Sequence, residues 1–297
     1  MEDLRAETPA VIRTGIIAAM TLRSVRLLLL AVCSILGALT ACISVPEGYE
    51  DWKQVNREYE SGDYITTLNY LDDLLRTENG YTARAAAWKV VILGGMTRSA
   101  LEIEEACAKG IFWVKTADSG PYKTCVDQFR RRARTSALGL IDALTDLENS
   151  AAAGGTVSLD FPLPEASAEP SPMIGQTGAG AMPGEKIFEP SAARILDRQI
   201  VLQVCDAVAN GEVAAVKGMF ESPPVTIPRE TFLVGVAKTL LVAAAVFGED
   251  RLDDTSKRSA TLQRARECLQ PAFDGADATL QSEAKAVARE ISAESRR

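Results

Sequence analysis

The chain of 297 residues contains no histidine. Histidine is the commonest general base, the usual neutral metal ligand and the side chain that activates serine or cysteine nucleophiles. Cys-x-x-C motifs, which are typical of zinc sites and thioredoxin-like redox centres, are absent as well. We therefore expect a non-catalytic protein with no catalytic residue, no metal site and no cofactor.

Positive charge is also scarce, since 32 lysines and arginines face 40 aspartates and glutamates and the net charge is -8. Binding to a phosphate backbone needs a concentrated positive face, so a nucleic-acid partner is disfavoured. One local exception is the run of Arg130, Arg131, Arg132 and Arg134. These arginines could bind anionic lipid headgroups or an acidic partner, although a solvated helix face is the more ordinary interpretation.

Aromatic residues make up only 6% of the chain, whereas alanine, leucine, glutamate and arginine are plentiful. This composition favours helices over sheets. Hydrophobic residues at 47% and charged residues at 24% are ordinary for a globular protein. The fold class expected is all-α.

A short apolar run near the N-terminus indicates export. Arg23 and Arg26 precede the apolar residues 27–39, and Thr40-Ala41-Cys42 follow them. A basic region followed by about a dozen apolar residues is typical of a secretory signal and falls short of the ~20 that a spanning helix needs. Residues 1–41 are therefore predicted to be a signal peptide that is removed. Acidic residues before Met20 suggest that translation starts there and that residues 1–19 are an extension.

The end of this segment, Leu39-Thr40-Ala41-Cys42, resembles the lipobox of bacterial lipoproteins. The resemblance implies that Cys42 becomes the first mature residue and carries the acyl chains, so residues 42–48 would form a lipid tether. Ile43 stands where some lipoproteins retained in the inner membrane carry aspartate, which implies the outer membrane. The alternatives are an ordinary signal peptide and a buried apolar helix with a chance cysteine.

Six cysteines are present, of which Cys33 would leave with the signal peptide. After Cys42, four remain in the exported part, and an even number outside the reducing cytosol predicts two disulfides with three possible connectivities. The pairing of neighbours within each half of the chain is favoured. It joins Cys107 to Cys125 and Cys205 to Cys268; four buried, reduced cysteines are the alternative.

Residues 49–150 show apolar positions at helical spacing. A first helix is predicted over Tyr49–Ser61, a turn at Gly62-Asp63, and a second helix from Tyr64 through Leu75. A third helix begins near Tyr81, with Gly94-Gly95 as a candidate break. Residues 109–121 are predicted to be a loop that leads into a long amphipathic helix.

The segment around Trp52 resembles the tetratricopeptide (TPR) family, whose unit is a pair of helices of about 34 residues. Trp52, Val55 and Tyr59 fall at the tryptophan, leucine and tyrosine positions of its motif, and Trp88 recurs 36 positions after Trp52. Asn56 replaces the glycine of the motif, so the resemblance is degenerate. It implies an α-solenoid of helix-turn-helix pairs, in which these aromatic residues pack in the core.

Residues 151–190 are rich in glycine, proline, serine and alanine, and are predicted to be a flexible linker between two helical halves. Within them, Val157 and Leu159 begin an alternating apolar stretch that could dock as an extended peptide in a helical groove. Residues 191–297 are predicted to be helical again. Residues 232–247 are expected to form a central core helix, since they are too few to span a bilayer. Asp253-Asp254 are expected to cap the helix that follows.

Two functions of different kinds follow from these features. The first is a lipid-anchored, non-catalytic scaffold that binds another envelope protein on its helical surface. The second is an accessory ligand-binding subunit of an envelope transport system, which would need a cavity beside residues 232–247. An enzyme with paired carboxylates is a third possibility, but the sequence gives no reason to pair any two acids.

Overall fold

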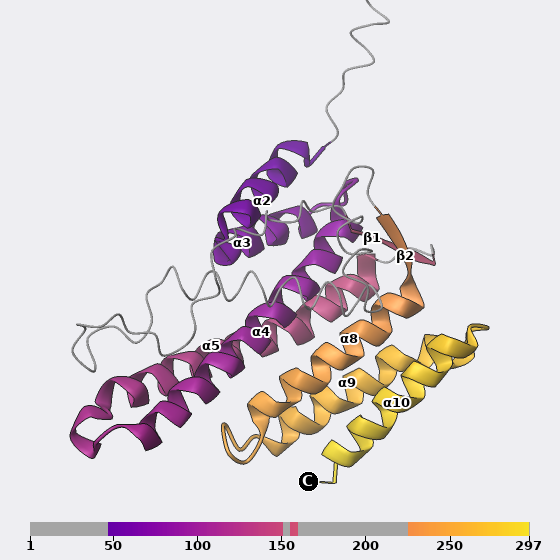
Figure 1. Ribbon diagram of the computed structural model, residues 1–297. Helices are drawn as coiled ribbons and strands as arrows, with labels where there is room; N and C mark the ends of the chain where they lie inside the picture. Colours follow the sequence, from indigo (N-terminus) through magenta and orange to yellow (C-terminus); the bar gives the residue numbers. More distant parts are fainter. Residues whose placement is uncertain (1–46, 151–154, 160–224, 297) are drawn as a thin grey trace, which may run out of the picture. The chain divides into compact units, whose positions relative to one another are not determined.

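The computed structural model describes residues 47–150, 155–159 and 225–296 (Figure 1). Within these ranges it contains seven α-helices and one pair of short strands, which confirms the all-α class. The predicted signal peptide, the lipid-attachment residue Cys42 and most of residues 151–224 lie outside the described ranges.

The first two helices begin and end where the sequence predicts. Helix α2 spans Tyr49–Ser61 and helix α3 spans Tyr64–Leu75. Gly62 has a φ of 77°, in the left-handed region that glycine adopts without strain, and the amides of Gly62 and Asp63 donate to the last carbonyls of α2. The carboxylate of Asp63 accepts a hydrogen bond from the amide of Thr66 and so caps α3.

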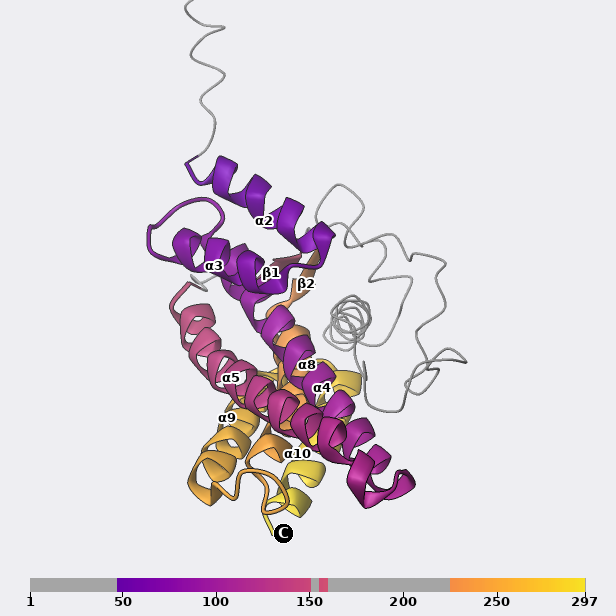
Figure 2. The same cartoon turned by 90° about the vertical axis from the view of Figure 1, so that its left-hand side faces the viewer.

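Helices α4 (Thr82–Trp113) and α5 (Gly120–Ser150) form a long antiparallel hairpin, seen in both Figure 1 and Figure 2. A break at Gly94-Gly95 is wrong, because α4 runs through both glycines and buries them. Each glycine lowers helix stability by about 1 kcal/mol, and tertiary packing offsets this loss. Close packing also occurs at Gly139, where an added Cβ would lie 3.3 Å from Leu93.

The helix pairs differ greatly in length. Helices α4 and α5 contain 32 and 31 residues, against 13 and 12 in α2 and α3. At 1.5 Å per residue, α4 is about 48 Å long, which exceeds any helix of a 34-residue unit. Helices α2 and α3 thus have the size of a tetratricopeptide-like pair and α4 and α5 do not, so a solenoid stays a prediction. The residues that carry the resemblance, Trp52, Val55, Tyr59 and Trp88, are all buried.

Three further helices pack together and against the hairpin. Helix α8 (Arg229–Ala244) continues into a short 3-10 turn, η2 (Ala245–Phe247), and is followed by α9 (Thr255–Asp274) and α10 (Ala278–Glu294). Helix α8 contacts α9, α10 and α4. By length and composition Arg229–Phe247 could cross a membrane, but 67% of its most apolar window is buried within the protein. The prediction of a core helix is confirmed.

Strand β1 (Thr156–Leu159) pairs antiparallel with strand β2 (Val225–Pro228). Val157 lies opposite Ile227, and both side chains are buried. The apolar stretch that begins at Val157 is thus extended, but it pairs with the segment before α8 instead of lying alone in a helical groove. Two later members of the stretch, Phe161 and Leu163, lie outside the described residues.

The last two helices are capped by aspartates. Asp254 accepts from the amide of Lys257 at the start of α9, and Asp277 accepts from the amides of Thr279 and Leu280 at the start of α10. Capping by Asp254 is as predicted.

Candidate functional site

The end of the long hairpin, residues 109–123, carries the two most exposed large apolar side chains of the described residues; we call it the hairpin tip. Helix α4 ends at Trp113, the backbone is extended at Val114, and a 3-10 turn, η1 (Thr116–Asp118), leads into α5 at Gly120. The predicted loop over residues 109–121 is therefore wrong at both ends, because α4 is helical through Trp113 and α5 begins at Gly120.

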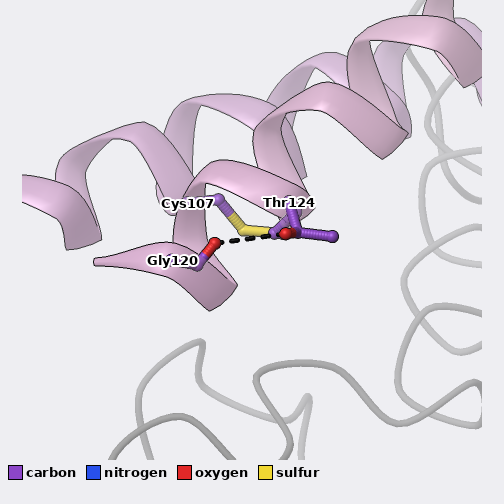
Figure 3. The surroundings of a disulfide bond; sticks show 4 residues. Cys107, Gly120 and Thr124 are labelled. Carbon is purple, nitrogen blue, oxygen red and sulfur yellow. Dashed lines mark hydrogen bonds between the residues drawn. A yellow bond between two sulfur atoms is a disulfide. The ribbon is translucent and has the colours of Figure 1, made fainter. Parts of the chain in front are cut away.

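A disulfide holds the two helices together at the base of the hairpin tip. Cys107 of α4 and Cys125 of α5 are bonded, with their Cα atoms 6.1 Å apart (Figure 3). The hydroxyl of Thr124 donates to the carbonyl oxygen of Gly120 at 3.2 Å beside it. The pairing is the one that the sequence favours for these two cysteines.

A second contact fixes the hairpin tip one turn beyond the disulfide. The ring of Tyr122 lies against the backbone of Gly110, so close that a Cβ on Gly110 would be 2.3 Å from the ring. Only glycine leaves room for the ring in this position. The disulfide and this contact together restrict how the two helix ends can move relative to each other.

The side chains of Phe112 and Trp113 in the hairpin tip are exposed to solvent. Their exposed fractions are 87% and 88%, compared with 65% for Ile65, 41% for Tyr49 and 37% for Val242, the other large apolar residues exposed in the described ranges. The sequence pattern does not single them out, because it predicts an ordinary loop over residues 109–121. The signal that could have found them is the unbroken apolar run 111–114 between lysines, which has no polar face to turn toward water.

The arginine run contributes to packing as well as to the surface. Arg130 donates from Nε and Nη2 to Oε1 of Glu104, at 3.0 and 2.8 Å. Arg251, in the turn that follows η2, donates from Nε to Oε2 of the same carboxylate at 2.8 Å. The Glu104 side chain is only 4% exposed, so the two arginines tie α4, α5 and the turn after η2 together around a buried carboxylate. Arg131 and Arg134 are exposed.

A second ionic cluster ties three helices near the other end of the hairpin. The ammonium of Lys89 on α4 lies 2.7 Å from Asp72 on α3 and 2.8 Å from Asp146 on α5. Burial of Lys89 disfavours its charged form, but the hydrogen bonds to both carboxylates outweigh this and raise the pKa of the ammonium above its ordinary value. The Lys89 ammonium thus joins α3, α4 and α5.

Of the remaining cysteines, only Cys268 is described. It is a buried free thiol in α9, and burial raises its pKa to about 12. A thiol in this environment is a poor nucleophile. Its expected partner, Cys205, lies outside the described residues, so that disulfide stays a prediction.

A cavity of about 230 Å³ lies between the α3–α4 turn and the end of α5. It is smaller than ordinary ligand sites, and the carboxylate of Asp146 on its wall is already bound by Lys89. Among the described residues, no group of three or more acidic or cysteine side chains is arranged to hold a metal ion.

Family models, curated proteins and solved structures gave no match to this chain. Functional proposals therefore depend on the residues themselves. The described ionic clusters join helices, and the hairpin tip exposes two aromatic side chains.

Proposed function

We propose that this protein is a lipid-anchored, non-catalytic scaffold of the bacterial cell envelope. Cys42 would carry the lipid, with the chain facing the periplasm from the outer membrane, and an envelope protein would bind its helical surface. The anchor is supported by the apolar run that ends in Leu39-Thr40-Ala41-Cys42.

The proposal that the protein is non-catalytic is supported by the ion pairs that the least exposed charged side chains of the described residues make. The carboxylate of Glu104 is occupied by Arg130 and Arg251, and the ammonium of Lys89 by two aspartates. A general acid or base needs a proton-transfer position open to substrate. These groups instead make ion pairs between helices, in a chain that has no histidine to take the role.

Packing around α8 favours the scaffold over the ligand-binding subunit. Phe232, Val236 and Leu240 are fully buried, and the helix contacts α9, α10 and α4. A ligand-binding subunit would need an apolar cavity beside this helix. Its apolar side chains are instead used in contacts with its neighbours.

Metabolic labelling with palmitate tests the anchor. Cells that produce the full chain should incorporate label, and Cys42→Ala should abolish it. Cys33→Ala is the matched control, because it removes a cysteine from the same segment and should leave labelling intact. Equal labelling of the parent and Cys42→Ala would refute the lipid assignment.

Chemical cross-linking in intact cells, followed by gentle solubilisation and affinity purification, tests the scaffold. We expect one envelope protein to be recovered in a fixed ratio with the full chain. Recovery of no stoichiometric partner would contradict the scaffold, whatever the labelling experiment shows.

A further inference from the structure

The hairpin tip combines exposure with rigidity. Phe112 and Trp113 are adjacent in sequence and almost fully exposed at the end of a helix about 48 Å long. The disulfide below them and the packing of Tyr122 on Gly110 hold the tip in place. Since little can relax to cover the two aromatic rings, they are arranged in advance for contact with something else.

Charge at the hairpin tip is opposite in sign to that of the whole chain. Residues 109–123 contain Lys109, Lys115 and Lys123 against the single acid Asp118, whereas the chain carries a net charge of -8. Lys109 is paired with Glu105 one turn earlier. Lys115 and Lys123, both exposed, follow the aromatic pair in sequence, whereas Lys109 precedes it. An anionic surface would repel most of this protein and attract it at this end.

We propose that the hairpin tip inserts Phe112 and Trp113 into the interfacial layer of a lipid bilayer that carries anionic headgroups. Aromatic side chains, tryptophan above all, favour the boundary between headgroups and acyl chains. Lysines beside them gain attraction to anionic lipids, about 1 kcal/mol for each cation near the surface. Phe112 and Trp113 with lysines near them are therefore suited to the negatively charged interface of such a bilayer. The contact is separate from the lipid on Cys42 and does not depend on it.

Trp113 supplies a native reporter for the experiment. The chain has three tryptophans, and the other two, Trp52 and Trp88, are 6% and 0% exposed. The emission of Trp113 alone should therefore change when the hairpin tip leaves water. Subtracting the spectrum of Trp113→Phe, which keeps an aromatic ring, isolates the Trp113 signal.

The full chain with Cys42→Ala is mixed with vesicles of phosphatidylethanolamine and phosphatidylglycerol. The apolar residues 27–39 can hold the chain on vesicles by themselves, so the readout is the environment of Trp113 and not total binding. We expect a blue shift of Trp113 emission, protection from acrylamide, and quenching by lipids with brominated acyl chains. These changes should be lost on neutral phosphatidylcholine vesicles and in Lys115→Glu/Lys123→Glu.

Ile65→Ser is the matched control, because it removes an exposed apolar side chain from α3 and should leave the Trp113 signal unchanged. Both the test and control variants alter exposed residues, and circular dichroism verifies that they fold. The proposal is overturned if acrylamide quenches Trp113 equally with and without anionic vesicles, or if neutral and anionic vesicles act alike. Protection of Trp113 by a co-purifying protein, with no effect of vesicles, also overturns it.

Discussion

Replacing Glu104 by alanine should lower the free energy of unfolding by about 3 kcal/mol. The side chain is 4% exposed and accepts three hydrogen bonds from two arginines, so its removal leaves both guanidinium groups without their main partner. Breaking a buried ion pair by deleting one member costs about 3–5 kcal/mol. The lower end applies here, because the arginine side chains are 31% and 20% exposed and water can reach them.

Urea denaturation followed by far-ultraviolet circular dichroism measures this loss, with the thermal midpoint falling by about 6–12 °C if the chain behaves as one unit of 150–250 residues. Glu105→Ala is the matched control. It is the next residue of α4, its side chain is 57% exposed, and its one ion pair is with Lys109 on the surface. Its cost should stay below about 0.5 kcal/mol.

The double variant Glu104→Ala/Arg251→Ala adds a test of the contact itself. Because the two side chains share an interaction, the double loss should be smaller than the sum of the single losses by about 1–3 kcal/mol. Additive losses, or a Glu104→Ala variant as stable as Glu105→Ala, would refute the conclusion that this carboxylate ties the C-terminal helices to the hairpin.

Three further predictions concern other described residues. Gly110→Ala should destabilise the protein through its clash with Tyr122, but in a Tyr122→Ala background the same change should stabilise it by about 1 kcal/mol; thermal unfolding of the four variants tests the change of sign. Reduction of the Cys107–Cys125 disulfide with dithiothreitol should lower the free energy of unfolding by about 2–4 kcal/mol. The same treatment should not destabilise the hairpin in the variant Cys107→Ala/Cys125→Ala. As the buried free thiol of the structure, with its pKa raised to about 12, Cys268 should resist iodoacetamide at mildly alkaline pH until the chain is unfolded without reductant, whereas a Cys205–Cys268 disulfide would block alkylation after unfolding as well; peptide mapping by mass spectrometry distinguishes the two.

Local sequence signals predicted the short helices well. Gly62 and Asp63 end one helix and cap the next, so the bounds of α2 and α3 depend on neighbouring residues alone. The prediction of a break at Gly94-Gly95 was wrong because helix propensity is a local quantity. It does not include the burial of this part of α4 against other helices, which keeps it helical.

Contacts between distant residues could not be predicted in the same way. Arg130 meets Glu104 at a separation of 26 residues, and Arg251 meets it at 147. Nothing in the arginine run distinguishes Arg130 from its exposed neighbour Arg131 until the hairpin places one of them beside a buried carboxylate. The pairing of Cys107 with Cys125 could be predicted from the sequence, because four cysteines allow only a few connectivities and these two are close in sequence.

The small sheet has a consequence for how the chain can be divided. Leu159, where β1 ends, lies directly opposite Val225, where β2 begins. The two ends of the 65 residues between them, 160–224, are therefore joined to the described fold at one pair of neighbouring backbones. Antiparallel strands can be joined by two residues such as Asn-Gly. A chain shortened in this way keeps the register of the two strands, and circular dichroism tests whether the seven described helices form without residues 160–224.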